Sequence, residues 1–138
     1  MNTQQKNVLP WSLIITLGLI ALIRPIIKIA GDVFGYTVSP LVTVLISVGI
    51  AVVWIGVVVT LKVRKPVIVL ALSGVAYAVL SIVMALAIQL LAPDLGDSEV
   101  AIATLLTSGL IATAIFNAAY GAFLGCVAYG VQKIVARR

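Results

Sequence analysis

Four long apolar runs, separated by short polar connections, constrain this chain more than any other feature of its sequence. Each run is long enough to cross a bilayer as a helix, because about 20 apolar residues span the hydrocarbon core. Only the first run contains charged side chains, those of Arg24 and Lys28. The pattern predicts an all-α integral membrane protein with one four-helix transmembrane domain over residues 1–138. The runs cover residues 11–30, 40–61, 67–91 and 100–131.

The composition also indicates that lipid solvates much of the protein. Hydrophobic residues make up 63% of the chain and charged residues 9%, whereas about a quarter of a soluble domain is charged. A soluble fold of this length could not bury so much apolar surface. The chain has one cysteine, Cys126, and no histidine. These counts exclude an intrachain disulfide and a zinc site built on cysteine and histidine clusters, and we expect no metal and no cofactor.

Helix-breaking and helix-capping residues fall between the runs. Pro40 and Pro66 come where the second and third helices should begin, a position at which the missing backbone N–H is harmless. Pro93 follows the third run, and Asp97 or Ser98 is suited to cap the fourth. Because the connections are short, consecutive helices are expected to be antiparallel neighbours. The sequence therefore predicts a small antiparallel bundle.

Charged residues outside the runs are divided by sign between the two sides of such a bundle. With four crossings, both termini and the connection between the second and third runs face the same side. The positive-inside rule places that side in the cytoplasm of a bacterium. The net charge of +5 then reflects membrane topology, and no nucleic-acid partner is expected. The cations on that side are Lys6, Lys62, Arg64, Lys65, Lys133, Arg137 and Arg138, and the acids on the other are Asp32, Asp94, Asp97 and Glu99.

Two cations lie within the first run, where topology does not require them. Arg24 lies about 20 Å from the start of the run, and Lys28 follows one turn later on the same face. A charge at that depth costs about 2.5 kcal/mol or more, so these residues are candidates for binding an anion or a lipid headgroup. Alternatively, Arg24 extends along its stem toward the outer headgroups or pairs with Asp32. Pro25 also frees the carbonyl of Ala21 as a further partner.

Small and polar residues recur every four positions along the fourth run and along the third. This spacing places them on one helix face, where small residues allow close packing and polar ones hydrogen-bond across the contact. We expect helix-packing seams, within the bundle or between protomers; in the alternative, Asn117 and Tyr120 line a polar pathway. The fourth run carries Gly109, Thr113, Asn117, Gly121 and Gly125, and the third carries Ser73, Tyr77 and Ser81, followed by Ala85 and Gln89.

Acidic residues are absent from all four runs. Four-helix small multidrug transporters rely on a membrane-buried carboxylate for proton-coupled export of cations, so that activity is not expected here. The chain also offers no pairing of serine or cysteine with histidine and no paired carboxylates for acid–base chemistry. We therefore expect that it is not an enzyme.

The chain resembles two families of four-helix membrane proteins. The segment from Asn117 to Gly125 is similar to the Asn-x-x-Gly-Ser-Phe-x-x-Gly stretch of fluoride channels. Its spacing differs by one residue and the paired-Phe segment is absent, so we attribute this similarity to convergent helix packing. A closer resemblance is to a family of uncharacterised small four-transmembrane-helix membrane proteins of bacteria, which implies a four-helix fold and no particular activity. The similar stretches are Ala21–Pro25, Trp54–Val58, Asn117–Gly121 and Gly130–Gln132.

Two functions remain open on the sequence alone. The first is an assembly or accessory protein that binds itself or another membrane protein through its helix faces. The second is a small oligomeric channel or transporter for an anionic solute, which Arg24 and Lys28 would attract. The lack of a buried acid disfavours coupling to cations but not the passage of an anion.

Overall fold

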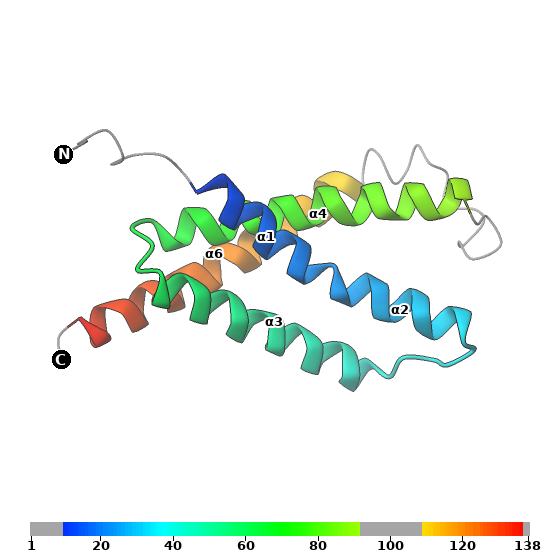
Figure 1. Ribbon diagram of the computed structural model, residues 1–138, viewed down its shortest axis with the longest axis horizontal. Coiled ribbons are helices and arrows are strands. Elements are labelled where there is room, and N and C mark those ends of the chain that lie inside the picture. Colours follow the sequence, from blue (N-terminus) through cyan, green and yellow to red (C-terminus); the bar gives the residue numbers. More distant parts are fainter. Residues whose placement is uncertain (1–9, 92–108, 137–138) are drawn as a thin grey trace.

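The computed structural model describes residues 10–91 and 109–136, apart from the side chain of Asp32. All regular structure in these residues is helical, which confirms the predicted all-α fold of four long apolar helices that pack together (Figure 1). Four segments are long and apolar enough to cross a membrane, the first of them formed by two consecutive helices. The elements are α1 (Trp11–Ala21), α2 (Ile23–Val33), α3 (Pro40–Thr60), α4 (Pro66–Leu91) and α6 (Leu110–Val135).

The first apolar segment is broken at Leu22, between α1 and α2. Pro25 has no backbone N–H, so it cannot donate to the carbonyl of Ala21. The chain instead tightens into a turn in which the Leu22 N–H donates to the carbonyl three residues earlier at 3.0 Å. The Ile26 N–H then donates to Leu22 at 3.1 Å and resumes the helical pattern. Arg24 lies in the first turn after this break.

Local sequence explains where α2 ends and α3 begins. Gly35 has a positive φ of 70°, a conformation that glycine adopts without strain. The Tyr36 N–H donates to the carbonyl of Gly31 at 2.8 Å, which closes α2 in a Schellman motif. α3 begins at Pro40, as the sequence predicts, and the Ser39 hydroxyl accepts a hydrogen bond from a first-turn N–H at 3.3 Å.

α3 ends in the same kind of motif, with a lysine where glycine is usual. Lys62 has a φ of 47°, and its N–H donates to the carbonyl of Val59 at 3.1 Å, while the Val63 N–H donates to Val58 at 3.1 Å. The side-chain amide of Gln132 on α6 also donates to the carbonyls of Val58 and Val63, at 2.9 and 3.3 Å. The last helix of the chain therefore covers backbone acceptors at the end of α3.

α4 and α6 form the most extensive helix pair, and the other helices are arranged around it. α1 packs against α4, α3 packs against α6, and α2 makes only slight contacts with α1 and α3. In Figure 1, α2 diverges from α4 beyond the break. No described residue of α2 is fully buried. The core lies between the other helices and includes Leu17, Trp54, Leu70, Leu124 and Ala128.

The fourth apolar run differs from its predicted bounds at its C-terminal end. α6 continues to Val135 rather than ending at residue 131, and its described part starts at Leu110. The predicted start at residue 100 lies outside the described residues, and so do the expected stop at Pro93 and the expected caps. The charged residues outside the description are Lys6, Asp94, Asp97, Glu99, Arg137 and Arg138, and the capping candidate Ser98 also lies there.

Candidate functional site

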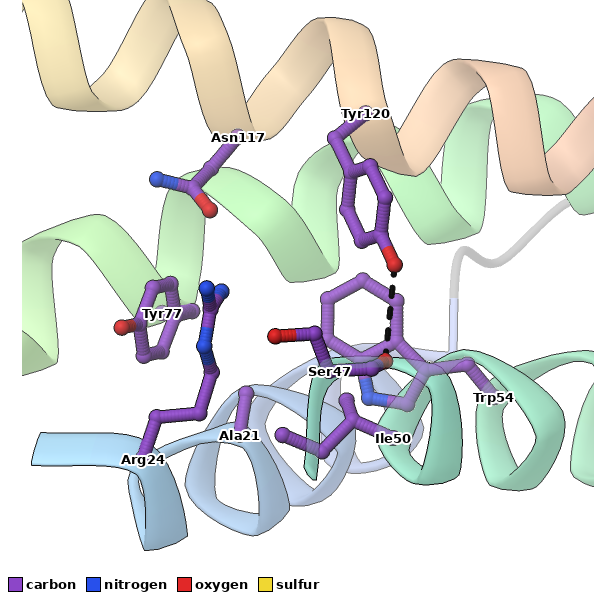
Figure 2. Close-up of a pocket in the computed structure, with 8 residues that line it drawn as sticks. All are labelled: Ala21, Arg24, Ser47, Ile50, Trp54, Tyr77, Asn117 and Tyr120. Carbon is purple, nitrogen blue, oxygen red and sulfur yellow. Dashed lines mark hydrogen bonds between the residues drawn. The ribbon is translucent and has the colours of Figure 1, made fainter. Parts of the chain in front are cut away.

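A pocket lies between the helices, at the level of the break in the first segment (Figure 2). The pocket is small: its empty space of about 250 Å³ includes space that is open to the outside, and it has room for about one water molecule. Each of the four membrane-length segments contributes to its wall, and most of the lining side chains carry a polar group. The convergence of these groups makes the pocket a candidate site for a small ligand. The lining residues are Ala21, Arg24, Ser47, Ile50, Trp54, Tyr77, Asn117 and Tyr120.

Arg24 supplies the single formal charge among the lining side chains. It is half-buried, and Figure 2 shows its side chain reaching from α2 toward Tyr77 and Asn117. Within the described part of the chain its guanidinium makes no hydrogen bond or ion pair, and the side chain of Asp32 lies outside that part. Lys28, one turn further along α2, is exposed and does not line the pocket. The structure therefore brings Arg24, but not Lys28, to the pocket.

Three polar side chains of the pocket already donate to backbone carbonyls. The Trp54 indole N–H donates to Leu17 at 3.0 Å and ties α3 to α1. The Ser47 hydroxyl donates to Thr43, one turn earlier, at 2.6 Å. The Tyr120 hydroxyl donates to the carbonyl of Ser47 at 3.5 Å, a long hydrogen bond between α6 and α3. These bonds fix the wall of the pocket and use the donors that the three side chains possess.

Asn117 and Tyr77 retain donors that a ligand could use. The Asn117 amide nitrogen donates to the carbonyl of Thr113 in its own helix at 2.8 Å, which leaves a second N–H and the amide oxygen. The Tyr77 hydroxyl makes no hydrogen bond with the described residues. The guanidinium of Arg24 adds five N–H donors. In Figure 2 the amide oxygen of Asn117 lies toward the Arg24 guanidinium, whereas the Tyr77 hydroxyl lies on the side of its ring away from it.

The glycines predicted on the fourth helix lie at the contact between α4 and α6. A Cβ atom added to Gly121 would lie 2.7 Å from the carbonyl carbon of Leu70, and one added to Gly125 would lie 2.9 Å from a backbone nitrogen of α4. Gly74 has the reciprocal position on α4, where an added Cβ would lie 2.6 Å from the carbonyl carbon of Asn117. Real Cβ atoms essentially never approach so closely. Only glycine fits at these three positions, because backbone meets backbone there.

The other residues of the two predicted stripes bond within their own helices. Ser73, which is fully buried, and Ser81 each donate to a carbonyl of α4 at 2.9 Å. Thr113 provides the carbonyl to which Asn117 donates, and Gly109 is the residue immediately before α6. In the described residues, α4 and α6 are thus joined here by close backbone approach, and these side chains form no hydrogen bond across the contact.

Sequence reasoning missed several residues that position the pocket. Trp54 is only 2% exposed and orients α3 against α1. Gly18 allows α1 to approach α4, since an added Cβ would lie 3.2 Å from the backbone nitrogen of Tyr77. Gly74 and Gln132 were not singled out either. A tryptophan in the middle of an apolar run was a usable signal, because its N–H requires an acceptor that lipid does not supply.

Comparisons with protein-family models, with curated proteins and with solved structures find no match to this chain. The family resemblance noted in the sequence therefore stays a prediction, and the pocket is interpreted from its own chemistry. Its lining offers a cation, neutral donors and aromatic rings, and it includes no carboxylate, cysteine or histidine. A cation with neutral donors beside it is suited to attract an anion.

Proposed function

We propose that this chain is a multi-pass protein of the bacterial cytoplasmic membrane, an antiparallel bundle with both termini in the cytoplasm. Its four long apolar helices support insertion. Large apolar side chains face outward, for example those of Leu45 and Phe116, which are 61% and 74% exposed and would be covered by lipid. The short connections at residues 34–39 and 61–65 support antiparallel neighbours. The distribution of cations and acids supports the orientation.

The proposed orientation is tested with single cysteines at Lys65 and at Asp94, each in a protein that lacks Cys126. An impermeant thiol reagent added to intact cells should label position 94 and leave position 65 unlabelled. After the cells are broken, both positions should react. Labelling of position 65 in intact cells would overturn the proposed topology.

The activity that we propose is the binding and passage of a small anion, by an oligomer of this chain acting as a channel or transporter. One observation carries this proposal: the Arg24 guanidinium lies in a pocket formed by all four segments, without a carboxylate among the lining residues. A cation at this depth is costly unless a partner neutralises it, and an anionic solute supplies that charge. The direction of the side chain, toward Tyr77 and Asn117 in Figure 2, argues against an arginine that only extends to the headgroups.

Anion flux into liposomes tests this activity. The purified protein should accelerate the uptake of small anions relative to empty liposomes, and Arg24→Gln should abolish the acceleration at equal incorporation. Lys28→Gln is the matched control, because Lys28 is on the same helix but outside the pocket; we expect it to retain most of the flux. Equal rates for the parent protein and Arg24→Gln would refute the proposed activity.

A second candidate function is assembly with a partner membrane protein or with another copy of this chain. Gly121 and Gly125 on α6 are used within the bundle, so a partner would need a different face. α3 offers one, because a Cβ added to Gly49 or Gly56 would meet no other atom within 4 Å. If this face forms an interface, Gly56→Leu should reduce the oligomer mass in mild detergent. An unchanged mass would show that α3 faces lipid.

A further inference from the structure

We infer that the end of the bundle at which α3 is followed by α4 is a binding surface for the headgroups of anionic phospholipids. Three exposed lysines form it, Lys62, Lys65 and Lys133, and we call it the lysine surface. The inference goes beyond the proposed passage of an anion, because it concerns another part of the chain and does not involve Arg24. It rests on the proposed insertion in a membrane, but not on which side of that membrane is cytoplasmic.

Segments that are far apart in the sequence meet at the lysine surface. Lys62 and Lys65 lie in the connection between α3 and α4, and Lys133 lies in the last turn of α6. Gln132, the residue before Lys133, donates to two backbone carbonyls at and just beyond the end of α3, at 2.9 and 3.3 Å. Figure 1 shows this connection and the last turns of α6 at the same end of the bundle. The fold therefore adds the charge of α6 to that of the connection.

The described part of the chain does not neutralise the positive charge of the lysine surface. None of the three ammonium groups makes a hydrogen bond or an ion pair with a described residue. Arg64 is also exposed and adds a fourth cation to the connection, and no Asp or Glu occurs among the described residues at this end. Cations that are close together repel one another and attract anions. A partner of this surface should therefore be negatively charged.

The position of the lysines favours a lipid headgroup as that partner. One apolar segment ends at Thr60, the next begins at Pro66 and the last ends at Val135. In a bilayer the lysines would thus lie at the boundary of the hydrocarbon core, where the headgroups are. Tyr129 on α6 is 53% exposed and precedes Lys133 by one turn on the same face. An exposed tyrosine suits this boundary, because its ring is apolar and its hydroxyl is polar.

The net charge of the headgroup should decide which lipid binds. Phosphatidylglycerol has a net charge of about −1 at neutral pH, whereas the choline cation of phosphatidylcholine balances its phosphate. A basic residue beside a membrane span increases the attraction of anionic lipid by about fivefold. Because the ammonium group of lysine acts as a compact point charge, the preference should follow charge and not side-chain shape.

Native mass spectrometry of the full chain in mild detergent measures this preference, because it counts the lipid molecules that remain bound. Phosphatidylglycerol should bind at least about tenfold more tightly than phosphatidylcholine with the same acyl chains. Lys62→Gln, Lys65→Gln and Lys133→Gln should each weaken the binding of phosphatidylglycerol by about threefold to fivefold. Lys28→Gln is the matched control, since it removes an exposed cation outside the lysine surface and should keep the preference.

Two further arms separate charge from packing and a lipid from a dissolved anion. Lys133→Arg keeps the charge and should bind phosphatidylglycerol as the parent does; equal losses in Lys133→Arg and Lys133→Gln would assign the effect to packing and overturn the inference. An excess of glycerol phosphate, which is the headgroup chemistry without acyl chains, should not displace the lipid. Displacement would reveal a site for a dissolved anion and would also overturn the inference. Circular dichroism establishes that each variant is folded.

The possible results distinguish this inference from the proposed function. Equal affinities of the parent for the two lipids, or equal effects of Lys28→Gln and Lys133→Gln, would overturn the inference and leave Arg24-dependent anion flux standing. Equal flux for the parent and Arg24→Gln would refute the proposed activity and leave the lysine surface standing. Release of the protein from membranes by sodium carbonate without detergent would refute insertion, and both proposals would then fail.

Discussion

The two sides of this bundle are built on opposite principles. At the contact of α4 with α6, glycines remove side chains so that backbone meets backbone, and an added Cβ at Gly74 or Gly121 would collide with a carbonyl group. In α2, no described residue is fully buried, and its half-buried Arg24 faces a pocket. The backbones of α4 and α6 touch at the glycines, whereas the pocket and its charge lie where these two helices meet α2 and α3.

In the membrane setting proposed above, this difference would allow a small bundle to accommodate a costly polar site. In lipid there is little hydrophobic driving force between helices, so stability depends on close packing and on internal hydrogen bonds. The α4–α6 contact supplies the close packing, and Trp54 and Gln132 tie α3 to α1 and α6 through backbone carbonyls. The loosely packed α2 can then present Arg24 without being responsible for the stability of the bundle.

The largest expected effect comes from filling the close contact. Gly121→Ala should lower the free energy of unfolding by about 3 kcal/mol, because the methyl group would overlap the backbone of α4. Gly130→Ala on the same helix is the matched control, since an added Cβ there meets nothing within 4 Å. The control should stabilise the protein by about 0.5–1 kcal/mol through helix propensity. Unfolding by SDS in mixed micelles measures both, and equal effects would show that the contact is not close.

Removal of the charge of Arg24, on the loosely packed α2, should change the free energy of unfolding in the opposite direction. Arg24→Gln is expected to raise the free energy of unfolding by up to about 2.5 kcal/mol, because it removes a charge from the membrane interior. Lys28→Gln, at an exposed position, should change it much less. The same SDS titration, performed without added anion, checks this. A destabilised Arg24→Gln protein would mean that the arginine has a structural partner within the folded chain.

A substitution at Gln132 tests whether the last turn of α6 contributes to stability through its contact with the end of α3. Gln132→Leu removes the two hydrogen bonds to the carbonyls of Val58 and Val63 and should destabilise the protein by about 1–2 kcal/mol. Hydrogen exchange should become faster for the amide of Val63, whose acceptor carbonyl also accepts from Gln132. Unchanged exchange at that amide would show that the contact contributes little.

The smallest expected effect concerns the turn that follows α3. Lys62→Gly should stabilise the protein by about 0.5–1 kcal/mol, because the positive φ of 47° is unfavourable for a residue with a Cβ atom and not for glycine. Lys65→Gly removes a cation from the same connection at a residue without positive φ and should give no gain. A gain of equal size for both would assign the effect to charge rather than to backbone conformation.

The sequence predicted those features that depend on one segment at a time. Four apolar runs gave four membrane-length helices, Pro40 marked the start of α3, and the proline in the first run explains its break at Leu22. The glycines at positions 121 and 125 were recognised as small-residue positions from their spacing alone. Arg24 was singled out because a charge inside an apolar run is costly whichever side of the helix carries it.

Only the tertiary structure decided which of these positions meet. It placed Arg24 beside Tyr77 and Asn117, left Lys28 outside, and paired the glycines of α6 with Gly74 on α4. The physical reason is that these helices are apolar on nearly all sides, so the pattern of hydrophobic residues does not distinguish the face toward lipid from the face toward protein. The rotation of each helix is set by close packing and by a few hydrogen bonds between segments, and those depend on two surfaces at once.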